Sequence, residues 1–257
     1  MIIELIGPSG AGKSTLARMV CDRLGGREHA TVATDLVLDR PGLRRIHNAT
    51  AANIVQDVCG LPFLAGALPE CADTLRLSAG LLREHAPSRF DHFMNARSVL
   101  RRIGMFELAR ARAAGRVVLV DEGPLLIAYH LFVYSTVALE RAPVERFAAT
   151  VPLPDRVIRI RTPFDVLAER AFSRPDRRRQ LAGMTPEEAE VPLRRASLVF
   201  DRLLAAPRLR ERTLVVDNPS RDLGELDRLA RRLAGTVASW QQDEQAGPAV
   251  LSAGALP

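Results

Sequence analysis

The residues with the clearest chemical purpose run from Gly7 to Thr15 and read Gly-Pro-Ser-Gly-Ala-Gly-Lys-Ser-Thr. They fit the pattern G-x-x-x-x-G-K-[ST] at every fixed position, and Lys13 is the single lysine among 36 lysine and arginine residues. Arginine presents a wide planar fork, whereas lysine is a compact charge on a slim stem that can reach between two phosphates. The spacing therefore predicts a loop that binds the phosphates of a nucleoside triphosphate.

The backbone N–H groups of such a loop point inward at the start of a helix, where the helix dipole also favours anions. Gly7 and Gly12 are expected to permit the tight turn and the close approach of phosphate. We expect the Ser14 hydroxyl to bind Mg²⁺ and Thr15 to reach the α-phosphate. The predicted nucleotide-binding residues of the loop are Gly7, Ser9, Gly10, Ala11, Gly12, Lys13, Ser14 and Thr15.

A pair of carboxylates, Asp121 and Glu122, directly follows the apolar run Val117–Val120. A buried strand would deliver Asp121 to the carboxyl edge of a sheet beside the phosphate loop, where it can hold Mg²⁺ or its waters. Glu122 is either a second group around the metal or a base. The plainer alternative is a strand that ends in an acidic turn.

A further carboxylate, Asp35, follows the second expected strand in Thr34-Asp35-Leu36. In an open parallel sheet this position faces the same crevice, so Asp35 could accept the proton of an acceptor hydroxyl that attacks the γ-phosphate. The same residue could instead cap the next helix, because Thr-Asp before an apolar run is a common helix start. The sequence leaves both interpretations open, and Asp39 is a weaker candidate for the base.

Arginines crowd the stretch after the fourth expected strand, at positions 170, 174, 177, 178 and 179. Pro175 and Asp176 interrupt this stretch, which favours a mobile loop over 170–180. A closing arginine lid would supply cations to the transferring phosphate and exclude water. Arg170 and Arg174, four residues apart, are the first candidates. The alternative is a solvated basic end of a helix.

The composition favours anionic partners, since the net charge is +6 and the pI is near 10.1. Aromatic residues make up only 5% of the chain, which is few for stacking on single strands, and the arginines are dispersed among 30 carboxylates. Phosphorylated or otherwise anionic small molecules are thus favoured over nucleic acid. Arg97, Arg101 and Arg102, before the third expected strand, could clamp an anionic acceptor or could be ordinary surface residues.

Three cysteines without a C-x-x-C pair suit a reducing compartment. The first apolar run, Ile2–Ile6, leads straight into the glycine loop rather than into a cleavage site. The later apolar stretch Leu125–Leu139 is shorter than a membrane-spanning helix requires. These features predict a cytoplasmic protein without a membrane partner.

Short apolar runs alternate with helical patterns, which predicts a parallel sheet with crossover helices. We expect strands at Ile2–Ile6, Ala30–Ala33, Val117–Val120, Val157–Ile160 and Leu214–Val216, and helices at Lys13–Leu24, Phe164–Ser173 and Leu223–Ala234. Residues 36–114 have helical periodicity broken by four prolines and are expected to form a helical substrate-binding insertion. The insertion and the lid belong to a single domain over 1–240, and 241–257 are expected to be a disordered tail.

From Met1 to about Ala234 the chain resembles P-loop kinases of the nucleoside and nucleotide (thymidylate-kinase-like) and small-metabolite type. The resemblance rests on the first strand, the glycine loop and the arginine-rich stretch after strand four. It implies an α/β P-loop NTPase fold, a three-layer sandwich with a five-stranded parallel sheet in the order 2-3-1-4-5. It also implies that Asp217 and Asn218, after the fifth strand, lie against the adenine.

This likeness implies a Mg²⁺- and ATP-dependent phosphotransferase that moves the γ-phosphate to a hydroxyl of a small metabolite. Asp35 resembles a substrate-contacting aspartate of shikimate, gluconate and adenylylsulfate kinases. Thymidylate-kinase-like members carry an arginine-bearing motif, which helps bind the acceptor's phosphate, where this chain has Asp121-Glu122-Gly123. This departure makes a nucleoside or nucleoside monophosphate kinase the alternative rather than the leading hypothesis.

A third alternative is a nucleotide-switched ATPase or binding protein, since Leu-Val-Asp-Glu also resembles ABC-type ATPases in which the glutamate activates water. The chain has no Asn/Thr-Lys-x-Asp motif for guanine, which favours ATP over GTP. The sequence leaves open the identity of the acceptor and the oligomeric state, a homodimer included.

Overall fold

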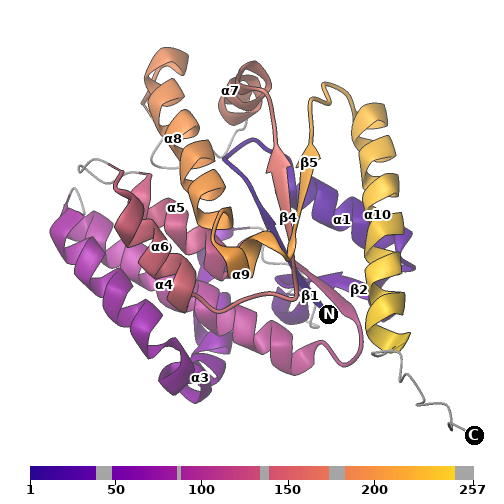
Figure 1. The fold of residues 1–257 in the computed structure, drawn as a ribbon, viewed down its shortest axis with the longest axis horizontal. Helices are drawn as coiled ribbons and strands as arrows, with labels where there is room; N and C mark the ends of the chain where they lie inside the picture. The colour runs from indigo at the N-terminus through magenta and orange to yellow at the C-terminus, as the bar shows by residue number, and fades with distance from the viewer. Residues whose placement is uncertain (39–47, 86–87, 134–138, 174–182, 247–257) are drawn as a thin grey trace, which may run out of the picture.

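The computed structural model describes residues 1–38, 48–85, 88–133, 139–173 and 183–246. Its centre is a sheet of five parallel strands in the order β2-β3-β1-β4-β5 (Figure 1). The strands are β1 Ile2–Ile6, β2 Ala30–Val32, β3 Val117–Val120, β4 Arg156–Arg161 and β5 Thr213–Asp217. The predicted fold class and strand order are confirmed.

Ten α-helices and two 3₁₀ turns are found among the described residues. They are α1 Lys13–Arg23, α2 Asp35–Leu38, α3 Ala49–His85, α4 Arg89–Arg112, α5 Ile127–Phe132, α6 Arg141–Thr150, α7 Phe164–Ser173, α8 Pro186–Leu204, α9 Pro207–Arg210 and α10 Leu223–Ala246, with η1 Gly26–Glu28 and η2 Pro124–Leu126. The expected strands all occur within two residues of their predicted ends. Short runs of β-branched residues between turn residues define where a strand can begin and end.

Alternate side chains of the central strand face opposite layers of helices. Ile3 and Leu5 of β1 pack with α1 and α10, whereas Ile2 and Ile6 face the side covered by α4, α5 and α8 (Figure 1). Since the strands are parallel, the loop after β1 and the residues after β3 leave the sheet at the same edge. The fold therefore brings together two segments that are more than 100 residues apart.

Between β2 and β3 the chain forms a long hairpin of the helices α3 and α4. The two helices approach closely at Gly60 and Gly104, where a Cβ on Gly104 would lie 2.7 Å from the Gly60 carbonyl oxygen. Pro62 and Pro69 lie inside α3, so the expectation that they interrupt the helix is wrong. Each proline removes one backbone hydrogen bond, and both are exposed, where water can bind the carbonyl that loses its partner.

The C-terminal helix α10 continues to Ala246, so the expectation of a disordered tail from residue 241 is wrong for Gln241–Ala246. Glutamine, glutamate and alanine are good helix formers, and the end of the helix is also tied to the sheet domain. Gln241 Nε2 donates to the Gly115 carbonyl at 3.5 Å, and Glu244 Oε2 lies 4.0 Å from the N-terminal amine. Residues 247–257 lie outside the described part of the chain.

Candidate active site

The glycine loop joins β1 to α1 and takes a backbone conformation that only glycine adopts easily. Gly10 and Gly12 have φ values of +86° and +87°. Gly12 also precedes the first residue of α1 and provides no side chain to cap the helix. The N–H groups of the first helical turn thus remain available to an anion in the loop.

Lys13 is almost fully buried at the start of α1, and its ammonium group is folded onto the loop. Lys13 Nζ donates to the carbonyl oxygens of Gly7 at 2.8 Å and Pro8 at 2.9 Å. Ser14 and Thr15, in the same helical turn, are exposed. Within this loop Ser9 and Ala11 are buried, so the loop presents backbone N–H groups, one ammonium group and two hydroxyl groups.

Two side chains from distant segments hold the loop. Asn218, which directly follows β5, is fully buried and its Nδ2 donates to the Ala11 carbonyl at 2.9 Å. Arg170, in the last turns of α7, donates to the Gly10 carbonyl at 3.3 Å and to the Ser220 carbonyl. In this structure Asn218 therefore contacts the backbone of the glycine loop, whereas Asp217 beside it is exposed.

A buried arginine in β4, Arg159, was not singled out from the sequence. Its Nη1 donates to the Ile160 carbonyl at 3.0 Å, and its Nε and Nη2 lie 3.3 and 3.2 Å from Asp201 Oδ1. Burial lowers the pKa of Arg159, and the Asp201 carboxylate opposes that shift. The sequence feature that could have identified it is an arginine within the apolar strand β4, which pairs with β1, the strand that leads into the glycine loop.

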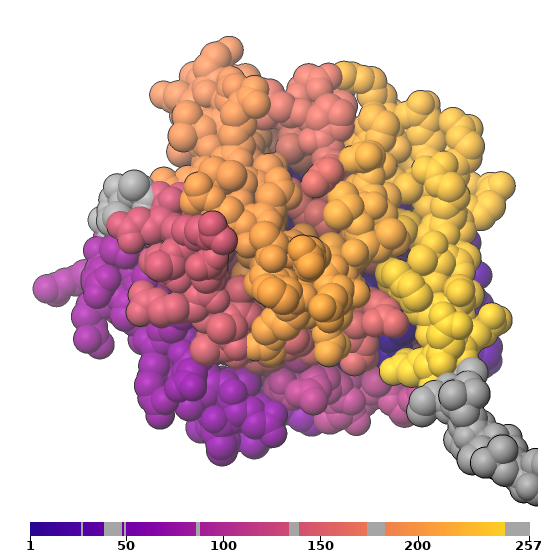
Figure 2. Space-filling view, in the orientation of Figure 1, coloured from indigo at the N-terminus to yellow at the C-terminus, as the bar shows by residue number. Residues whose placement is uncertain are grey.

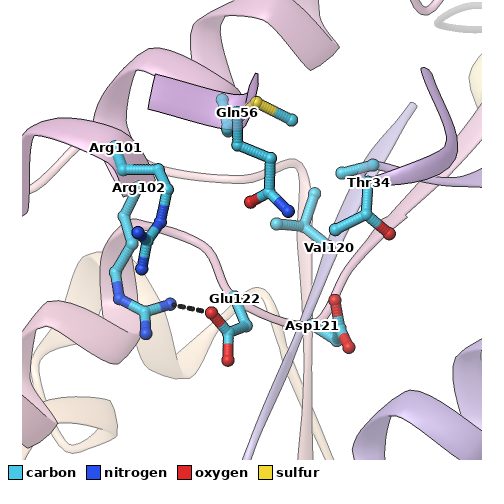
Figure 3. Close-up of a pocket in the computed structure, with 9 residues that line it drawn as sticks. Thr34, Gln56, Arg101, Arg102, Val120, Asp121 and Glu122 are labelled. Atoms are coloured by element: carbon cyan, nitrogen blue, oxygen red, sulfur yellow. Dashed lines mark ion pairs between the residues drawn. The ribbon is translucent and has the colours of Figure 1, made fainter. Parts of the chain in front are cut away.

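Next to the loop, the carboxylates after β3 line a narrow pocket (Figure 3). Asp121 is 8% exposed and Glu122 is more open. The polar residues that line the pocket are Thr34, Gln56, Arg101, Arg102, Asp121 and Glu122. Gln56 comes from α3 and the two arginines from α4, so the helical hairpin forms one wall and the edge of the sheet the other.

Arg102 connects this pocket to a buried polar network. Only 3% of Arg102 is exposed, and its Nη1 lies 3.3 Å from Glu122 Oε2 (Figure 3). Its Nη2 lies 3.2 Å from His130 Nε2, and His130 Nδ1 lies 3.2 Å from Asn95 Oδ1. Of the three arginines considered on α4, the structure brings Arg101 and Arg102 to the pocket, while Arg97 pairs with Asp57.

Glu4 of β1 is a second residue that was not singled out from the sequence. Its carboxyl group lies next to Gly123, in the turn that carries Asp121 and Glu122. Its carboxylate is fully buried and accepts the N–H groups of Leu125 at 3.3 Å and Leu126 at 3.2 Å. Burial raises the pKa of Glu4 to about 8, although these N–H groups and Arg102 oppose the shift. Glu4 thereby fixes the turn that carries the carboxylates of the pocket. A charged residue inside an apolar strand was the signal available.

The structure does not bring Asp35 into the pocket of Asp121 and Glu122. Asp35 begins α2 and lines a separate depression with Arg18 and Asp22, while its neighbour Thr34 lines the pocket. Arg174, Asp39 and residues 174–180 of the expected lid lie outside the described residues. Their predicted roles stay predictions.

No protein-family model matches the chain, and no curated protein sequence matches it. Solved structures of similar shape include a shikimate kinase from Bacteroides thetaiotaomicron, with 14% identity, a TM-score of 0.43 and coverage of 93% of this chain and 98% of that one. A shikimate kinase from Acinetobacter baumannii in complex with shikimate has 16% identity, a TM-score of 0.43 and 93% coverage of both chains. A deoxyadenosine kinase from M. mycoides with bound dATP has 14% identity, a TM-score of 0.46 and coverage of 91% and 99%. Similarity at this level does not decide activity or substrate.

Proposed function

We propose that this protein is a Mg²⁺- and ATP-dependent phosphotransferase that moves the γ-phosphate to a hydroxyl group of a small metabolite. The observation that carries the proposal is the shared sheet edge. A phosphate-binding loop with its lysine follows β1, and a separate polar pocket with two carboxylates follows the neighbouring strand β3. One site would bind the donor phosphates and the other the acceptor.

On the donor side, Lys13 and the N–H groups of the loop would bind the phosphates. The exposed Ser14 hydroxyl and the Asp121 carboxylate supply the hard oxygen ligands that Mg²⁺ prefers. Mg²⁺ binds through one or two protein oxygens plus phosphate and would neutralise phosphate charge. The adenine would lie near Asp217.

On the acceptor side, we assign substrate binding to the insertion of residues 36–114, which contributes Gln56, Arg101 and Arg102 to the pocket. The guanidinium groups and the amide suit an acceptor with several hydroxyl groups or an anionic group. Two carboxylates compete for the role of base: Glu122, which lines the pocket, and Asp35, the candidate from the sequence, which could act only on an acceptor that reaches its separate depression. Loss of turnover with unchanged ATP binding in Asp35→Asn but not in Glu122→Gln would assign the base to Asp35, and the reverse would assign it to Glu122.

We further propose that Arg170 and Arg174 neutralise the transferring phosphoryl group. The hydrogen bond from Arg170 to the Gly10 carbonyl supports this role, because it holds a guanidinium group against the phosphate loop.

The test is release of ADP from Mg·ATP with a panel of sugars, cyclitols, amino-alcohols, nucleosides and nucleoside monophosphates. Lys13→Ala serves as the blank. We expect release that needs both Lys13 and one class of acceptor, and a preference for nucleosides or their monophosphates would make the protein a nucleoside or nucleotide kinase. Release that needs Lys13 and ignores every acceptor would contradict phosphotransfer and favour an ATPase or a nucleotide switch.

A further inference from the structure

The outer side of the α3–α4 hairpin carries most of the exposed apolar surface that the structure describes. Seven of the eleven exposed large hydrophobic residues in the described part of the chain lie on these two helices, with exposures of 41–64%. They are Ile54, Val58, Leu61 and Leu68 of α3 and Phe90, Phe93 and Leu100 of α4, and we call them the hairpin face. Their spacing of three, four or seven residues puts each set on one side of its helix.

The two sets of the hairpin face meet in one groove. Leu61 of α3 and Phe93 and Leu100 of α4 line a groove of about 350 Å³ between the helices. The stretch Thr50–His85 is long and apolar enough to cross a membrane by length and composition, yet only 17% of its most apolar window is buried. Contiguous apolar patches of this kind on a folded domain mark surfaces that another molecule covers.

We propose that a second copy of this chain covers the hairpin face, so that the protein is a homodimer whose two hairpins pack together. The seven side chains expose roughly 700 Å², which is close to the ~800 Å² that each partner contributes to a stable interface. A two-fold axis would place the same patch of each copy against the other and bring four helices into one bundle.

The charged residues of the groove form ion pairs within one copy of the chain. The charged side chains that line it are Asp57, Arg97 and Arg101, and they are paired with one another. Arg97 binds Asp57 directly, and Arg101 Nη1 lies 3.5 Å from Asp57 Oδ1. Asp57 neutralises one of these two arginines, so each groove keeps a net charge of +1 at its centre. Exposed small residues between the apolar ones, Ala65 and Gly66, would let the helices approach closely.

The exposed side of α3 argues against a membrane as the covering partner. It is apolar only from Ile54 to Leu68, about 15 residues or roughly 22 Å of helix, which is less than the ~30 Å of a bilayer core. From Glu70 onward this side carries exposed charges, including Asp73 and Arg76. The end of α10, where the described chain stops, lies on the opposite side of the molecule from α3 (Figures 1 and 2).

The test is the mass of the full chain in solution by light scattering and sedimentation between about 1 and 100 µM. We expect a dimer for the wild type and at least about a 100-fold weaker dimer for Leu61→Arg, because a charge would be buried at the centre of the interface. Leu223→Arg, on the exposed start of α10, is the matched control and should remain dimeric.

A second readout needs no variant. Amide hydrogen exchange of the wild type should show protection of α3 and α4 that increases with protein concentration, while α10 stays unchanged. A monomeric wild type at 100 µM, a dimer unaffected by Leu61→Arg, or monomers that bind phosphatidylglycerol vesicles through the hairpin face would each overturn the proposal. None of these measurements depends on phosphotransfer, so the proposed activity and the proposed dimer can fail separately.

Discussion

Replacing Glu4 with glutamine should change how the stability of the protein depends on pH. Glu4 is fully buried on β1, and burial raises its pKa from 4.5 to about 8. The folded protein thus prefers the protonated carboxyl group, whereas the unfolded chain ionises it near pH 4.5. The contribution of Glu4 to stability is complete below pH 4.5 and is lost as the pH rises toward 8.

The size of the effect follows from the two pKa values. Each pH unit between them lowers the free energy of unfolding by about 1.4 kcal/mol, so the wild type should lose about 4 kcal/mol between pH 5 and pH 8 through this group. Glutamine does not titrate, but its NH₂ group must face the N–H of Leu125 or Leu126. That mismatch should cost about 1–3 kcal/mol at every pH. Glu4→Gln should therefore be less stable than the wild type at pH 5 and more stable at pH 8.5.

The assay is urea unfolding of both proteins at half-unit steps from pH 5 to 8.5, followed by far-UV circular dichroism. The quantity that matters is the difference in unfolding free energy between wild type and variant, because other titrating groups cancel in it. Glu211→Gln, which removes an exposed carboxylate, is the matched control. A constant difference between the wild type and Glu4→Gln across this range would refute the reasoning.

Three further predictions concern the loop and the hairpin. Lys13→Ala should lower ATP turnover by at least about 10³-fold with little change in melting temperature, because it removes the cation at the phosphates; a milder loss measured by ADP release would contradict the assignment. Asn218→Ala removes a buried hydrogen bond to the loop and should raise the KM for ATP by roughly 5–10-fold, the equivalent of about 1 kcal/mol. An unchanged KM would show that the loop keeps its conformation without the hydrogen bond from Asn218. Gly104→Ala would press a Cβ onto the Gly60 carbonyl, so it should destabilise the protein by about 1–3 kcal/mol, whereas Gly80→Ala, in open space on α3, should stabilise it by about 0.5–1 kcal/mol. Urea denaturation measures both, and equal effects would rule out the close helix approach.

The strands and the glycine loop between β1 and α1 were predictable because their signals are local. A short β-branched run such as Val117–Val120 can hardly be anything but a buried strand, and the spacing of Gly7, Gly12 and Lys13 specifies a loop conformation over nine residues. The prolines of α3 misled the prediction for the opposite reason. Their effect depends on whether the helix face that carries them is exposed, and the local sequence does not reveal that.

The chemistry of the site divides in the same way. The sequence by itself determined the parallel sheet, the glycine loop between β1 and α1 and the position of Asp121 after β3, because these depend on residues close together in the chain. Only the tertiary structure showed that Glu4 supports the turn after β3, that Asn218 donates to the glycine loop, that Arg159 pairs with Asp201, and that Asp35 lies apart from Glu122. Those contacts join segments from 40 to more than 200 residues apart, and a side chain's neighbours across such separations are set by how layers of helices pack on the sheet. Local patterns specify elements, while packing decides which side chains of those elements meet.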